Sequence, residues 1–331
     1  MSAIKDDAKI AVSVVVHACG RIDLLDRCLD ALVRQQFHPR RYDIIVVDDE
    51  PNHNTLHLVA GWRTRTLDRG PRLSYVANPG PGGPPAALNR GWRVARAPIV
   101  AFTRDDVVPE PGWLAAGLAA CDDRTEVVCG RVQTLIAPHP ADAQPGAHAL
   151  EAADFTSASC FLRKPVLERL GGFDERFDIR GSDADMYFRL LEHGIAIAQA
   201  PVALALHPVG PAPWGQSLLR VRHEEFDALL YKKHPALYRQ KVEPSPAWDN
   251  YVVAGVLLLA LVSALLGMDI MAALAFGAWL LLTARRCAHS LRGAAHTPSH
   301  VAEMVVTSAL LPLLTVFWRL AGAVRYRVRF A

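Results

Sequence analysis

The sequence predicts an α/β domain with a parallel β-sheet, followed by a C-terminal region of membrane helices. Between residues 10 and 102, short β-branched apolar runs alternate with segments whose apolar residues have helical spacing. Between residues 250 and 284 the only charged residue is Asp269. We therefore expect a catalytic or binding domain over 1–245 and a membrane region over 246–331.

The N-terminal elements follow one another in a regular order. The segment 10–16 (IAVSVVV) is a continuous β-branched run, which is typical of a strand buried on both faces. Six further elements are predicted in turn: a helix at 24–35, a strand at 42–47, a helix at 55–66, a strand at 72–76, a helix at 85–95 and a strand at 99–102. Such alternation with short links gives a parallel sheet with helices on both faces, whose ligands bind at the carboxyl ends of the strands.

Composition excludes several classes of protein. The 36 Lys and Arg against 33 Asp and Glu give a net charge of +3, too balanced for a nucleic-acid binder. The six cysteines are far apart and form no C-x-x-C pair, so we expect reduced thiols rather than a zinc site or a disulfide framework.

The apolar run from 250 to 284 is too long for one membrane span and just short of two. We predict helices at 251–267 and 270–284, with Gly267-Met268-Asp269 as the tip of the hairpin. The alternative is a buried helical hairpin in a soluble protein, but such helices usually keep a polar stripe.

A third apolar segment, 301–324, contains Glu303, Pro312 and Arg319. We favour a broken helix at the cytoplasmic interface, because a third span would put the basic terminus RYRVR opposite Arg285 and Arg286, against the positive-inside preference. A true third span stays open as the alternative. No apolar signal segment precedes the first strand, so we expect residues 1–248 to face the cytoplasm at the cell membrane.

Two acidic pairs stand at predicted strand ends, Asp48-Asp49 and Asp105-Asp106. A single Asp there is more often a helix cap or a turn former. Two such pairs, which we expect on neighbouring strands, favour a ligand instead, because carboxylates after buried strands need a partner. The loop 78–85 (NPGPGGPP) is too rich in proline to be a dinucleotide fingerprint or a P-loop.

Four segments in this order and spacing resemble the inverting family 2 glycosyltransferases with the GT-A fold. They are VSVVVHACGRIDLLDRCLDALVRQ, YDIIVVDDEPN, NPGPGGPPAALNRGWRVARAPIVAFTRDDVVPEPGWL and LRKPVLERLGGFDERFDIRGSDADMYFRLLEHG. The resemblance covers residues 10 to about 240.

The resemblance implies roles for the acids at the strand ends. Asp48 matches the residue that hydrogen-bonds the nucleotide base, with Asp49 beside it, and Arg21 lies near the nucleotide. Asp105 and Asp106 stand at the D-x-D position. There we expect Asp106 to bind Mn²⁺ or Mg²⁺ on the diphosphate and Asp105 to contact the ribose or sugar.

In SDADMYFR, Asp183 matches the catalytic base. The alternative is a purely structural role, in which the helix dipole favours Asp183 and Asp185 at the start of a helix. His207 falls where related enzymes have a metal or diphosphate ligand, although a lone His is more often structural. Arg222 falls in a segment expected to close on the donor, and its alternative is a solvated basic helix face near the membrane.

Four positions depart from the family pattern. Leu88 replaces an Arg before Asn89, which we still assign to donor binding. Arg104 replaces an acid, Ser182 a Glu and His17 a Pro. Arg104 could take over the lost phosphate contact or reduce metal affinity by its charge.

The resemblance and the membrane region together imply a membrane-anchored inverting glycosyltransferase of polysaccharide biosynthesis. Its donor is expected to be a nucleotide-sugar, with UDP as the nucleotide, and its acceptor a lipid-linked or cell-surface glycan. Two alternatives stay open: an inactive nucleotide-sugar-binding membrane protein, and a membrane nucleotidyltransferase.

Overall fold

The computed structural model describes residues 9–80, 83–122, 124–136, 153–210, 213–243, 248–291 and 297–329. The described chain forms two compact units. The first lies within Met1–Leu135 and Gly146–Val209, and the second includes Gly210–Ala331. The sequence suggested a boundary at 245, but residues 213–243 group with the C-terminal helices because α12 (Pro298–Arg325) packs on α8 (Glu225–Lys233).

The first unit is built on an eight-stranded sheet with the order β3-β2-β1-β4-β7-β6-β8-β5. Its first four strands run parallel and lie where the sequence predicted them: β1 Val12–Ala18, β2 Tyr42–Asp48, β3 Arg72–Ala77 and β4 Ile99–Arg104. Every residue of β1 and β2 is buried, as the continuous apolar runs indicated.

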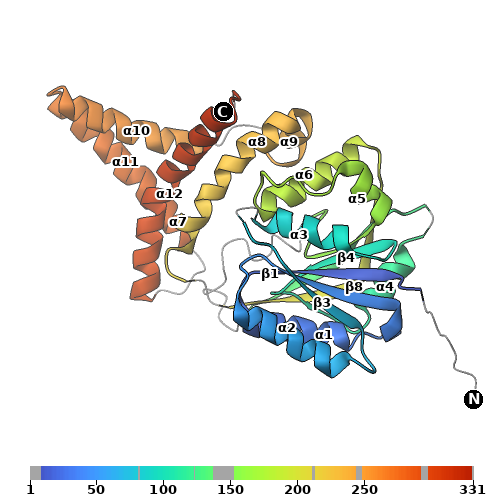
Figure 1. Ribbon diagram of the computed structural model, residues 1–331. Coiled ribbons are helices and arrows are strands. Elements are labelled where there is room, and N and C mark those ends of the chain that lie inside the picture. The colour runs from blue at the N-terminus through green and yellow to red at the C-terminus, as the bar shows by residue number, and fades with distance from the viewer. Residues whose placement is uncertain are drawn as a thin grey trace, which may run out of the picture. The chain divides into compact units, whose positions relative to one another are not determined.

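Helices cover both faces of this sheet, which confirms the predicted α/β architecture (Figure 1). On one face, α1 (Ile22–Val33), α2 (His53–Thr66) and α4 (Trp113–Ala120) pack against alternate residues of β1 such as Val14. On the other face, α3 (Gly83–Val94), α5 (Lys164–Leu170) and α6 (Ile179–Glu192) pack against Val15 and its neighbours. The two core clusters follow from the two-residue period of a strand.

The remaining strands are antiparallel. β7 (Ser159–Arg163) pairs with β4 and with β6 (Val127–Ile136), and β5 (Val108–Pro109) pairs with β8 (Ile197–Val209). The sheet is therefore mixed, and the parallel half carries the acidic pairs at the ends of β2 and β4. These two strands are not neighbours, contrary to the expectation from the sequence, because β1 pairs with both and lies between them.

The second unit consists of helices. Four short helical segments, α7 (Gln216–Arg220), a 3₁₀ turn at Val221–Glu224, α8 and α9 (Pro235–Lys241), precede three long ones: α10 (Trp248–Leu265), α11 (Asp269–Ser290) and α12. All three long helices are long and apolar enough to cross a membrane. The predicted hairpin tip is confirmed, since Gly267 has a left-handed backbone (φ +72°) between α10 and α11.

The prediction that 301–324 is broken is wrong. α12 is continuous over 28 residues with Pro312 inside it, because a proline removes only one bond of the helical ladder and neighbouring helices support the rest. The second predicted helix was also too short. α11 continues past Arg285 to Ser290, because arginine is a good helix former and marks a membrane edge rather than a helix end.

Candidate active site

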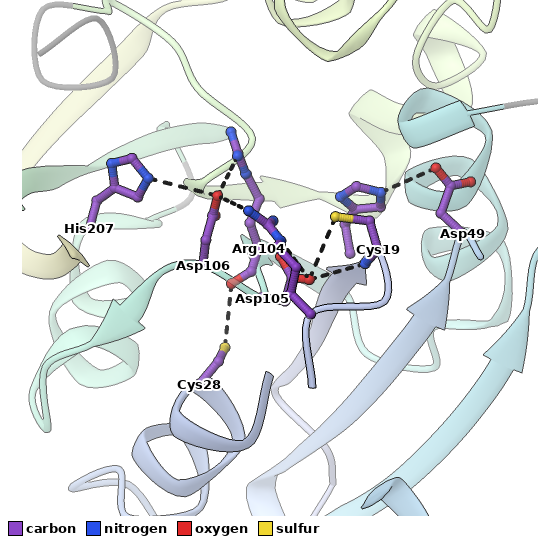
Figure 2. Close-up of polar contacts among 9 residues, drawn as sticks. Cys19, Cys28, Asp49, Arg104, Asp105, Asp106 and His207 are labelled. Atoms are coloured by element: carbon purple, nitrogen blue, oxygen red, sulfur yellow. Dashed lines mark hydrogen bonds and ion pairs between the residues drawn. The ribbon is translucent and has the colours of Figure 1, made fainter. Parts of the chain in front are cut away.

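Asp105 and Asp106 follow β4 directly (Figure 2). Both form ion pairs with Arg21, which precedes α1. Asp105 is fully buried. Its Oδ2 accepts hydrogen bonds from the Cys19 amide at 3.0 Å and from Arg21 Nε at 3.4 Å, and its Oδ1 pairs with the Arg21 guanidinium. Asp105 thereby fixes the turn after β1 and the direction of the Arg21 side chain.

The second acid, Asp106, lies among three basic side chains. Its Oδ2 is 2.6 Å from Arg104 Nη2, 2.9 Å from Arg21 Nη1 and 3.7 Å from His207 Nε2. Burial opposes ionisation, but Arg104, His207 and Arg21 outweigh it and hold the pKa of Asp106 well below its usual value. Asp106 is therefore a carboxylate at every physiological pH.

The residues around Asp106 can supply some, but not all, of the ligands of a divalent cation. Its Oδ1 is buried without a hydrogen-bond partner, and the described residues include no group of three or more His, Cys, Asp or Glu that could hold a metal alone. Asp106 and His207 can supply two ligands, which suits an ion that takes its other ligands from phosphate and water. The structure thus brings together the two predicted metal ligands.

Asp183 lies in the second turn of α6, where its Oδ2 accepts hydrogen bonds from the Ser157 amide at 3.0 Å and Thr156 Oγ1 at 3.3 Å. Its Oδ1 is buried without a partner. Burial raises the pKa of Asp183 to about 6 against these hydrogen bonds and the charge of Arg104. A carboxylate with such a pKa is suited to accept a proton near neutral pH.

The alternative that the helix dipole favours the acids of α6 fits a residue closer to the start of the helix, because the effect is confined to the first turn. Asp178 is the N-cap of the helix and accepts from the Gly181 amide at 2.7 Å. Asp185 is buried and bonded to Arg189 Nε at 2.7 Å. Asp183 therefore needs a different explanation, and its unpaired oxygen is consistent with a ligand.

The two acids after β2, Asp48 and Asp49, differ in burial and in hydrogen bonding. Asp48 is buried and accepts hydrogen bonds from Tyr75 Oη at 3.0 Å and from the amides of Glu50 and Asn52. Asp49 is partly accessible and accepts from Asn78 Nδ2 at 2.8 Å. Asp48 shapes the turn, and Asp49 presents a carboxylate beside it.

Residues 13–138 match the family model Glycosyl transferase family 2. The chain carries a family 2 glycosyl transferase domain of the GT-A fold. The mannosyltransferase PcManGT from Pyrobaculum calidifontis, solved with GDP-Man and Mn²⁺, has the same fold, with a TM-score of 0.55 at 19% identity over 96% of this chain and 87% of that one.

Two curated proteins are similar to this chain in sequence. The O-antigen biosynthesis protein RfbC of Myxococcus xanthus is 29% identical over 224 residues, which are 59% of this chain and 17% of RfbC. Validoxylamine A glucosyltransferase of Streptomyces hygroscopicus subsp. limoneus is 28% identical over 224 residues, 56% of this chain and 48% of the enzyme. The alignments thus span less than half of either relative.

Asn89 holds the loop before α6. It is buried, and its amide donates to the Phe173 carbonyl and Glu175 Oε1 and accepts from the Phe173 amide and Trp92 Nε1, all at 2.8–2.9 Å. A carboxamide has two donors and two acceptors, so all four have partners within the protein in this structure. The assignment of Asn89 to donor binding stays a prediction.

Three further basic residues, His17, Arg104 and Arg222, were singled out in the sequence. His17 Nε2 lies 3.4 Å from Asp49 Oδ2, a contact that the family's proline could not make. The ion pair of Arg104 with Asp106 was also not predicted, although Arg104 already departed from the family pattern. Arg222 lies exposed in the second unit, and its assignment to donor binding stays a prediction.

Proposed function

We propose that this protein is a membrane-anchored, inverting glycosyltransferase that moves a sugar from a nucleotide-sugar, expected to be a UDP-sugar, to a lipid-linked or cell-surface glycan. The observation that carries the proposal is Asp183, a base with a raised pKa. It lies in the same unit as a permanently ionised Asp106, and the charge of Arg104 acts on both carboxylates.

In this mechanism Asp183 accepts the proton of the acceptor hydroxyl while that oxygen attacks the anomeric carbon. The bond between this carbon and the phosphate oxygen breaks on the opposite face, so the configuration inverts and a nucleoside diphosphate leaves. The hydrogen bonds from Thr156 and Ser157 to Oδ2 leave Oδ1 of Asp183 as the oxygen that takes the proton. One displacement needs one base.

The leaving diphosphate needs positive charge around it. Arg21, directed by Asp105, supplies a guanidinium at the strand ends, and Asp106 with His207 would hold the Mn²⁺ or Mg²⁺ ion. When bound, that ion supplies Lewis-acid stabilisation of the departing phosphate oxygens. Asp49 is the accessible acid of its pair, and we assign it together with Asp48 to the nucleotide base.

The second unit supports membrane anchoring. Its long helices are apolar on the outside: Leu258, Leu274 and Leu281 are exposed, whereas Ser263 and Thr283 are buried. A soluble helix shows the reverse pattern. The side chains therefore suit a surrounding of lipid, and a hairpin of α10 and α11 would insert into it.

The third long helix would lie at the membrane interface. α12 runs beside α7 and α8, and its contacts with them and with the following residues are spread over its length: Glu303 with Gly215, Arg319 with Glu243 and Tyr326 with Lys232. From 303 to 326 the helix is about 35 Å long. Because the partner segment carries many charged residues, which are costly in hydrocarbon, we place both at headgroup depth.

This anchoring favours an acceptor that is itself at the membrane. RfbC is named for O-antigen biosynthesis, a product of polysaccharide type, which supports the same class of acceptor here. The donor would reach the first unit from the cytoplasm, at the cell membrane.

The test is a panel of nucleotide-sugars incubated with the full chain and membrane lipid extract. We expect release of a nucleoside diphosphate that depends on the extract and on Asp183. Release of pyrophosphate from a nucleoside triphosphate would instead indicate a nucleotidyltransferase. Binding of a nucleotide-sugar without any turnover would indicate an inactive relative.

A further inference from the structure

Arg104 has a place in this site that the proposed mechanism does not use. It is the last residue of β4, two positions before Asp106, and it is mostly buried. Its Nη2 lies 2.6 Å from Asp106 Oδ2, the same oxygen that Arg21 Nη1 contacts at 2.9 Å. One carboxylate oxygen is therefore shared by two guanidiniums, while the other oxygen, Oδ1, is buried without a partner.

Two positive charges at Asp106 have a consequence for cation binding. A divalent ion that approaches this carboxylate meets the repulsion of Arg104 and Arg21, and it competes with Arg104 for Oδ2. A donor changes this balance because its diphosphate is negative and accepts forked hydrogen bonds from a guanidinium. Arg104 can then leave Asp106 without losing an anionic partner.

We propose that Arg104 is a resident cation that Asp106 holds until the donor arrives, and that it then transfers to the diphosphate as the divalent ion takes its place. The inference rests on the proposed function. Arg104 is then a positioning residue. It keeps the affinity of Asp106 for the divalent ion low when no donor is bound, and it makes the binding of the ion and of the donor cooperative.

The experiment measures Mn²⁺ binding by electron paramagnetic resonance of the free ion, on the full chain in detergent, with and without UDP or GDP. In the parent we expect nucleotide to tighten Mn²⁺ binding by about 10-fold or more, within the usual range of coupling between two sites. In Arg104→Gln we expect Mn²⁺ alone to bind several-fold tighter than in the parent, and the effect of nucleotide to shrink by a similar factor.

Three variants make the result interpretable. Arg104→Lys keeps the positive charge but loses the paired N–H donors of the guanidinium. Mn²⁺ alone should therefore still bind weakly, whereas nucleotide should tighten Mn²⁺ binding less than in the parent. Arg63→Gln, an exposed change on α2, should leave both measurements unchanged, and Asp106→Ala should abolish Mn²⁺ binding. Melting temperatures of all variants check that each one is folded.

The outcomes separate the two proposals. If Arg104→Gln binds Mn²⁺ as the parent does, with and without nucleotide, the role of Arg104 is wrong and the transferase proposal stands. If the parent binds neither Mn²⁺ nor either nucleotide, the donor site itself is wrong, and the inference about Arg104 is overturned with it.

Discussion

At the scale of single residues, the environment of Asp183 sets its chemistry. Two hydrogen bonds to one oxygen favour the carboxylate, whereas burial of the other oxygen disfavours it, and burial prevails. The result is a carboxyl group that changes its charge near pH 6 instead of near 4. The pKa of Asp106 moves in the opposite direction, because two guanidiniums contact its carboxylate.

Substitution of Asp183 by Asn should separate catalysis from binding. We expect turnover to fall by about 10²- to 10⁴-fold, since the general base is lost, while the nucleotide-sugar still binds with near-parental affinity. Turnover is measured as released nucleoside diphosphate and binding by calorimetry. Asp178→Asn is the matched control, because Asn also caps a helix. A parental turnover in Asp183→Asn would remove this residue from the mechanism.

The pH dependence follows from the raised pKa of Asp183. Its base form is lost as the pH falls through about 6, so kcat/KM should decline by tenfold per pH unit below that point. A rate profile between pH 4.5 and 8 checks this. A flat profile down to pH 5 would contradict the assignment.

The same shift predicts a change in stability. Between pH 3.8 and about 6 the unfolded chain releases a proton that folded Asp183 keeps, so stability falls as the pH rises through this window. Asp183→Asn lacks this penalty. Its melting temperature should exceed that of the parent at pH 7.5, and the difference should vanish towards pH 3.5. A variant that is less stable than the parent at pH 7.5 would show that the carboxylate stabilises the fold.

At the scale of elements, α3 and the loop before α6 approach each other closely at Gly172. Gly172 has φ +78°, and a Cβ there would lie 2.2 Å from Asn89 Oδ1 and 2.6 Å from Trp92 Nε1. Asn89 meanwhile bonds both backbone groups of Phe173. The start of α6, and with it Asp183, therefore depends on the carboxamide of Asn89.

Gly172→Ala should test this contact. The left-handed backbone and the overlap with Asn89 both oppose a Cβ, so we expect a loss of about 2–4 kcal/mol in the free energy of unfolding. Denaturant unfolding of the detergent-solubilised chain measures it. Gly194→Ala shares the positive φ (+66°) but has open space around its Cβ, so it isolates the backbone contribution. Equal losses in the two variants would mean that the contact with Asn89 contributes nothing.

At the scale of the whole molecule, the long apolar helices and the acids of the candidate site lie in separate units. The first unit contains the described acids of the site, and the second presents apolar side chains outward. A catalytic domain fixed to a bilayer meets lipid-linked acceptors at high local concentration, which would compensate for weak affinity.

The topology can be tested at the C-terminus. If α10 and α11 form the only hairpin and α12 lies at the cytoplasmic interface, a cysteine introduced by Ala331→Cys should react with an impermeant thiol reagent only after lysis. The background carries Cys287→Ser, and the same background without the added cysteine is the blank. Labelling in intact cells would mean three crossings and an external C-terminus.

The sequence alone determined the parallel half of the sheet, the hairpin tip at Gly267 and the positions of the acidic pairs. These features depend on local patterns: buried strands are continuously apolar, a hairpin tip needs a flexible residue, and strand ends of a parallel sheet converge. The family pattern pointed to Asp183 and Asp106 without coordinates, and their roles stay predictions.

Tertiary packing determines which polar groups already have hydrogen-bond partners within the protein and which can still bind a ligand. Asn89 and Asp105 match the family pattern as well as Asp183 does, but their hydrogen bonds are taken by residues distant in the sequence, such as Phe173 and Cys19. The continuity of α12 also has a tertiary side, because Pro312 is buried within the second unit, where neighbouring segments can support the helix around it. Local patterns specify where a side chain stands, whereas its partners come from chain segments that only folding brings together.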